Sequence, residues 1–170
     1  KISGVGASLQ KFSAIGALAG GSAIKMAMDF DKNITQIEAL VGTSGQALQE
    51  FSDAAKEMAK QTGISSAKTS EAMFFIASAG LEGAEAISVL EAASKASASG
   101  LGDVATVADL ATSAMNAYGS ENLNAEHATD ILVAAVKQGK LEASELAGSM
   151  GSVIPTASAL GVSFDEVGAA

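Results

Sequence analysis

The sequence predicts an all-α protein, a compact array or bundle of about seven short helices with glycine C-caps, preceded by a longer N-terminal helix. Hydrophobic residues make up 48% of the 170 residues, but aromatic residues only 4%. Alanine accounts for many of the hydrophobic residues that are not aromatic. It favours helices and is depleted in strands. Glycines suited to end helices also recur at intervals of 17, 20, 19, 20 and 22 residues: Gly63, Gly80, Gly100, Gly119, Gly139 and Gly161.

Such regular intervals are typical of a helical solenoid or of a bundle of short antiparallel helices. A solenoid built from sequence repeats would show similar side chains in successive intervals. The side chains here do not repeat. We therefore favour the compact bundle.

The stretch GISSAKTSEAMFFIASAGL (63–81) is expected to form the central helix, because it carries no charged residue after Glu71. A helix that is apolar on nearly all sides has to be surrounded by other elements. We therefore expect residues 73–77 at the centre of the core.

Residues 1–22 form a small-residue apolar segment that we expect to be helical, ahead of a helical domain over 23–170. Residues 12–24 are uncharged and would make a helix of roughly 20 Å, shorter than the ~30 Å hydrocarbon layer. We favour packing in the core or against sister chains. Insertion of residues 4–28 into a membrane is the alternative, because small-residue spacing also suits helix pairing in lipid.

A stripe of apolar residues begins at Ala23 and continues in alternating steps of four and three. This is the heptad spacing of a coiled coil, although it lasts for too short a stretch to be decisive. The stripe predicts either an oligomer seam or a helix docked on its own domain, and we favour the intramolecular interpretation. The candidate interface with a sister copy or partner is Ala27, Phe30, Ile34, Ile37 and Val41.

The remaining helices follow from apolar stripes and end signals. A capping box of Thr43 and Gln46 is expected to open the helix that ends at Gly63, and mixed charges mark the exposed face of this helix. Further helices are predicted over 82–99, over 103–118 and, after a cap at residues 122–124, as far as Lys137.

The seventh helix is expected to start near Glu142 and to bury an apolar stripe that includes Val153. Proline removes one helical hydrogen bond and disfavours helix at the residue before it. We therefore expect a break or kink at Pro155. Ser163 and Glu166 form a second predicted capping box.

Catalytic and metal-binding patterns are not evident in the sequence. It has no cysteine and a single histidine, and we interpret His127 as a surface residue near a helix start. The paired acids suit helix N-termini, so we expect no enzymatic activity, no cofactor and no metal. All ten basic residues are lysine against 19 acids, which argues against sequence-specific nucleic-acid binding.

Four stretches together resemble the core region of tailed-phage tail tape measure proteins. They are MAMDFDKNITQIEALVG (26–42), AKQTGISSAKTSEAMFFIASAGL (59–81), AASKASASGLGDVATVADLATSAMNAYG (92–119) and MGSVIPTASALGVSFDEVGAA (150–170). The resemblance runs from about Ala23 to the end, in the order that the family shows. Residues 1–22 match only in being small and apolar.

The resemblance implies a structural virion protein in the tail tube lumen or tail tip, which sets tail length and takes part in tail assembly and genome delivery. It implies sister copies, tail tube and tail-tip proteins and tail assembly chaperones as partners, a stay in the host cytoplasm during assembly, and possible contact with the host membrane. We expect the chain to be a fragment of a longer protein. Because it turns back so often, we expect a folded domain rather than the ruler itself.

Overall fold

The structure is a computed structural model that describes residues 20–139 and 143–170, where every regular element is a helix. The predicted all-α class is confirmed. The longer N-terminal helix is α2, which a wider π-type turn over Ile37–Val41 extends. The helices are α2 (Gly20–Gln36), α3 (Gly45–Thr62), α4 (Ser66–Ser78), α5 (Gly83–Ala96), α6 (Val104–Tyr118), α7 (Ala125–Gly139), α8 (Ala143–Ala159) and α9 (Phe164–Ala169).

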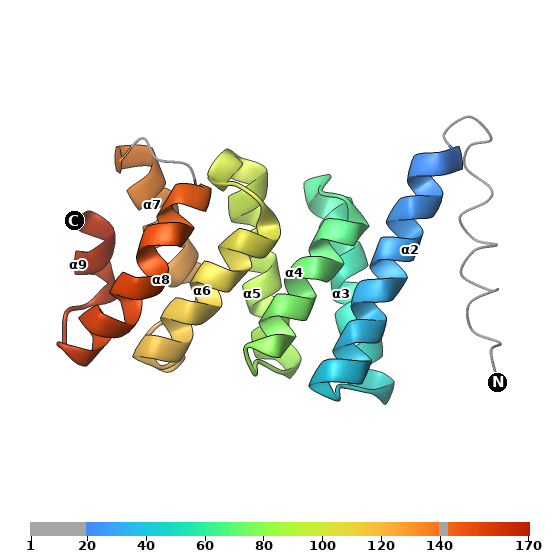
Figure 1. Cartoon of the computed structure of the whole chain (residues 1–170), viewed down its shortest axis with the longest axis horizontal. Coiled ribbons are helices and arrows are strands. Elements are labelled where there is room, and N and C mark those ends of the chain that lie inside the picture. Colours follow the sequence, from blue (N-terminus) through green and yellow to red (C-terminus); the bar gives the residue numbers. More distant parts are fainter. Residues whose placement is uncertain (1–19, 140–142) are drawn as a thin grey trace.

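The helices form two layers stacked in chain order (Figure 1). Helices α2, α4, α6 and α8 lie side by side in the front layer, and α3, α5, α7 and α9 form the layer behind. The extensive contacts in the described part of the chain join helices that are one or two positions apart. Of the two arrangements considered from the sequence, this open stack agrees with the solenoid rather than with a closed bundle.

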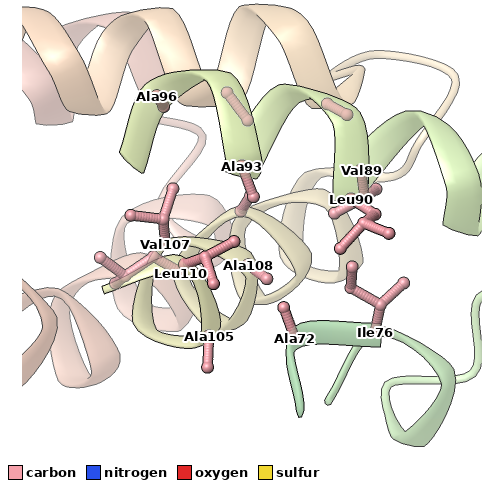
Figure 2. Close-up of a cluster of buried hydrophobic side chains, with 14 of the residues drawn as sticks. Ala72, Ile76, Val89, Leu90, Ala93, Ala96, Ala105, Val107, Ala108 and Leu110 are labelled. Carbon is pink, nitrogen blue, oxygen red and sulfur yellow. The ribbon is translucent and has the colours of Figure 1, made fainter. Parts of the chain in front are cut away.

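The core lies where α4, α5 and α6 meet. Figure 2 shows the side chain of Ile76 in α4 and that of Leu90 in α5 pointing towards each other. Both side chains are fully buried, as is Met73. Alanines fill most of the remaining contact, and their small size lets the helices approach closely: Ala72, Ala93, Ala96, Ala105, Ala108, Ala111 and Ala114.

The prediction for residues 73–77 is confirmed for Met73, Ile76 and Ala77, which are buried. It is wrong for Phe75, whose side chain is 40% exposed. Phe74 is half-buried against the core and meets the Phe75 ring edge-on, with centroids 5.7 Å apart. The Phe75 side chain instead lines a shallow groove between α4 and α6, outside the core.

Glycine ends most of the helices as predicted. Five of the six expected stops have φ between 74° and 94°, whereas Gly139 is the last helical residue of α7. At Gly80 the Leu81 amide donates to the Ile76 carbonyl at 3.4 Å, and the Gly80 amide donates to that of Ala77 at 3.0 Å. This Schellman pattern turns the buried Leu81 back onto the core.

The two predicted capping boxes differ in outcome. The box of Ser163 and Glu166 is present at the start of α9. The box of Thr43 and Gln46 is wrong, because Ser44 is the residue before α3 and no side chain caps the helix there. Gln46 is then the second residue of the helix, whereas a capping box requires the third, whose side chain reaches back to the backbone amide of the cap residue. The Gln46 side-chain amide donates to the Glu50 carboxylate instead.

Helix α8 continues through Pro155, so the predicted break is wrong, and the alternative of a kink stays a prediction. Proline removes one backbone hydrogen bond, but residues on both sides of it are held by the stack. Ile154 is 1% exposed and Ala157 is 8% exposed. Tertiary packing therefore maintains the helix against the local preference.

We predict opposite effects of alanine at Gly80 and at Gly151. An added Cβ meets no atom within 4 Å at either site, but Gly80 has φ +88° and Gly151 lies inside α8 with an ordinary helical backbone. Gly80→Ala should lower the free energy of unfolding by about 1–2 kcal/mol through backbone strain. Gly151→Ala should raise it by roughly 0.5–1 kcal/mol. Urea denaturation followed by circular dichroism measures both, and effects of the same sign would contradict this explanation.

Candidate functional site

The candidate interface predicted from the sequence lies on the side of α2 that packs against the chain's own core. Phe30 and Ile37 are buried, at 7% and 0% exposure. Ile34 and Val41 are partly buried against the same core, and Ala27 is half-buried. An interface made by these five residues with another chain would require α2 to leave the stack.

Polar contacts fix α2 in this position. The Asn33 side-chain amide donates to the carbonyl of Ala67 and to the hydroxyl of Ser70 in α4, each at 3.0 Å. The Lys56 ammonium of α3 lies 5.3 Å from the centroid of the Phe30 ring, within range of a cation–π interaction. Asn33 thus marks the flank of α2 that faces α4.

The opposite flank of α2 exposes apolar side chains. Ile24 and Met28 are 55% and 65% exposed, and at 3.6 residues per turn they lie about 180° and about 140° around the helix from Asn33. Charged residues accompany them, including Lys25, which forms an ion pair with Asp29 at 3.6 Å. The predicted membrane segment 4–28 falls largely outside the described residues, which include only its last part.

Helix α8 and the residue that follows it present a second exposed stripe, which we call the outer stripe of α8: Ser149, Val153, Thr156 and Leu160. Val153 is 44% and Leu160 is 76% exposed. Steps of four, three and four residues place these side chains on one face at heptad spacing. The core is contacted instead by Leu146, Met150, Ile154 and Ala157, which are all buried.

The outer stripe faces away from the neighbouring helix of its layer. The Ser158 hydroxyl donates to the Ala117 carbonyl of α6 at 2.6 Å, so Ser158 marks the flank that faces α6. Val153 and Leu160 lie about 140° and about 160° around the helix from Ser158. Within the described residues, the flank of α8 that faces away from α6 is therefore exposed.

Sequence reasoning missed this surface, because it placed Val153 in the buried stripe. That assignment is wrong for Val153, whereas Ile154, which the same predicted stripe includes, is buried. One feature of the sequence could have identified the surface. Residues 146–164 carry no charged side chain, which is unusual for an exposed helix and typical of the central part of an interface.

A shallow groove of about 430 Å³ lies between α4, α6 and the start of α8, with Phe75, Glu71 and Asp109 among its lining residues.

Asp103 accepts hydrogen bonds from the Lys68 ammonium and, at 3.1 Å, from the Ala105 amide. Burial raises the pKa of Asp103, but these bonds and the charge of Lys68 outweigh it, so its pKa lies below the ordinary value. The same partnership raises the pKa of Lys68. This pair links α4 to α6.

The single histidine lies on the surface, as predicted. Nε2 of His127 is 3.2 Å from a carboxylate oxygen of Asp165, which joins α7 to α9. The sequence did not indicate this partner, which comes from another helix. Over residues 20–139 and 143–170, no cluster of three or more His, Asp or Glu side chains is placed to hold a metal ion.

None of the helices in the described part of the chain combines the length and the apolar character that a membrane-spanning helix requires.

Comparison with known proteins yields a consistent set of matches. A family model described as phage-related minor tail protein matches residues 52–170. The chain is 26% identical over 148 residues to a tape measure protein of Pneumococcus phage Dp-1, covering 87% of this chain and 13% of that protein. It is 24% identical over 152 residues to a probable tape measure protein of Clostridium phage phiCD119, covering 87% of this chain and 16% of that protein.

The chain thus spans less than a fifth of the length of these relatives. No solved structure matches it significantly. The family match begins within α3 and includes the rest of the stack.

We predict that Asp103 stabilises the fold in a pH-dependent manner. Because its pKa is lowered on folding from the ordinary 3.8, the stabilisation is present above that value and is lost as the pH falls through the folded pKa. Asp103→Ala should lower the free energy of unfolding by about 0.5–2 kcal/mol at pH 7, since it also removes the cap of α6. The deficit should shrink towards pH 3.

Urea denaturation at pH 7, 5 and 3 measures this deficit. Asp103→Asn is the matched control, because asparagine still caps a helix but carries no charge. Its deficit at pH 7 should be smaller than that of Asp103→Ala. A deficit that stays constant down to pH 3 would contradict the role of the carboxylate.

Proposed function

Because the chain belongs to the phage-related minor tail protein family, we propose that it is a structural, non-enzymatic domain of a tail tape measure protein, located in the tail tube or tail tip of a virion. The observation that carries this proposal is the family match, which extends over most of the helix stack. The names of the two relatives, both tape measure proteins, support it. In the whole protein the role would be to set tail length and to take part in assembly and genome delivery.

Within such a protein we propose that this segment is a folded domain and not the ruler. An extended helix advances ~1.5 Å per residue, so about 150 residues would reach roughly 225 Å. In the stack, neighbouring helices of one layer are ~8–10 Å apart. Each step of that size uses two helices and their connections, about forty residues. The stack therefore advances only about 0.25 Å per residue, too little for an efficient ruler.

We propose that the stack contacts other proteins. These partners are tail tube and tail-tip proteins, sister copies and, during assembly in the host cytoplasm, tail assembly chaperones. The net charge is −9 and no basic residue is arginine. A surface of this kind repels nucleic-acid phosphates. We therefore do not assign sequence-specific nucleic-acid binding to it.

We predict that lengthening this domain leaves tail length unchanged. Thirty residues inserted after Gly119, in the connection between α6 and α7, would lengthen an extended ruler by about 45 Å if they continued its helix. In a stack they form a surface loop and add no length. Tails measured by electron microscopy should therefore match those of the parent phage.

The same insertion after Glu82, between α4 and α5, is the matched control and should behave alike. Tails that grow by about 45 Å with either insertion would show that the segment is part of the ruler.

The membrane alternative for residues 4–28 has a direct test in liposome flotation. We predict that the purified chain does not float with vesicles of anionic and zwitterionic lipid, because we assign its exposed apolar residues to protein contacts. The variant without residues 1–28 is the control. Flotation of the whole chain that disappears in this variant would favour a membrane-inserting domain that acts on the host envelope.

A further inference from the structure

We propose that residues 2–17 form a further helix of this chain, which packs antiparallel on the flank of α2 that exposes Ile24 and Met28. The segment directly precedes α2 and lies outside the described residues. Its docking on α2 neither requires nor excludes the proposed tail role.

The surface to be covered is the flank of α2 that faces away from α4. Ile24 and Met28 are 55% and 65% exposed there, whereas Asn33 bonds to α4 on the other flank. Helices α4 and α6 each pack against the helix before them and the helix after them in the chain. The described residues supply no helix ahead of α2. The exposed flank is therefore where a preceding helix is expected.

The sequence of residues 1–19 has the pattern of a helix with one apolar side. Steps of three, four and three residues place four large apolar side chains on the same side of a helix: Ile2, Val5, Leu9 and Phe12. In such a helix Lys11 lies about 100° around from Phe12, outside the stripe. An isolated helix of this length is marginal in water, so the apolar stripe has to pack against another surface.

The lengths of the two segments match. Helix α2 has 17 residues and so rises about 26 Å, and residues 2–17 rise about 24 Å as a helix. Residues 18 and 19 then form the connection, within the ~2–5 residues that join antiparallel helices. The glycines agree with this unit, because Gly20 precedes Gly42 by 22 residues and Gly42 precedes Gly63 by 21. These intervals are close to those between the other helix stops.

The facing side chains and the charges of the two segments are complementary. A connection at residues 18 and 19 brings Phe12 about level with Ile24, and Leu9 about level with Met28, so apolar side chains meet along the flank. Residues 1–19 carry two lysines and no acid, whereas residues 20–41 carry three acids and two lysines. The two segments therefore attract each other.

The docked position gives the segment a contact surface other than lipid. With the apolar stripe packed on Ile24 and Met28, the side of the helix that faces water carries small and polar residues and Lys11. The chain is then expected to stay apart from vesicles, in agreement with the flotation prediction.

Limited proteolysis with trypsin tests the docking, because trypsin cleaves after lysine and Lys11 lies within the segment. In the parent chain this cleavage should be slow, at a rate set by how often the segment opens. Met28→Asp should speed it about tenfold or more, because a carboxylate facing Leu9 would lose its hydration. Leu160→Asp replaces an exposed apolar residue beside α8, at the other end of the described stack, and should leave the rate unchanged.

Cleavage after Lys25 is the internal control, because Lys25 lies in α2 itself. It should stay slow in Met28→Asp, which would show that α2 remains folded while the segment is released. Met28→Leu retains an apolar side chain in the contact, so cleavage after Lys11 should stay slow in this variant. Mass spectrometry of the fragments separates the two cleavage sites.

Three results would overturn the proposal. The first is rapid cleavage after Lys11 in the parent chain, and the second is slow cleavage there in Met28→Asp, which would place the segment on another surface. The third is protection of Lys11 that is lost on dilution, because contact within one chain does not depend on concentration. That result would assign the flank to the segment of a sister copy. These measurements need no assembled tail, so their failure leaves the proposed tail role unaffected.

Discussion

Burial in this protein depends on the contact of each helix with the helix two positions along the chain. The helices are rich in alanine and short, so none of them encloses much apolar surface by itself. Met73 and Ile76 reach full burial because α4 has α2 and α6 beside it and α3 and α5 behind it. The hydrogen bonds of Asn33 to α4, the bond from Lys68 to Asp103 and the bond from Ser158 to Ala117 repeat this connection along the front layer. Side-by-side pairing within a layer is therefore what the other features of the fold require.

The sequence predicts the helices well and their neighbours poorly. Glycine at a left-handed position is a local requirement, so the stops at Gly63, Gly80 and Gly161 could be read directly. The layers could not, because periodicity shows which side of a helix is apolar and does not show which helix covers it. The same limit explains the exposure of Phe75 and the error at Val153, which lies next to the buried Ile154. At Pro155 a local preference predicted a break or kink, and the helix continues there with buried residues on both sides of the proline.

For the candidate site too, the sequence indicates which residues are apolar but does not show which helix covers them. The stripe from Ala27 to Val41 could be predicted as a contact surface, and the choice between an intramolecular and an intermolecular contact required the position of α4. Identifying the outer stripe of α8 required both the sequence and the arrangement of the helices. Its lack of charge is visible in the sequence, but its exposure depends on where α6 lies.

The open stack also determines how the domain responds to force. In a closed bundle, pulling on one end strains a single shared core, whereas here α2 is held mainly by α4 and can be detached while α6 and α8 keep their contacts. Under tension along the chain, the domain would come apart one helix at a time from a terminus, with a small resistance at each step. Such a chain can be threaded through a narrow channel in stages, and no step has to overcome the stability of the whole fold.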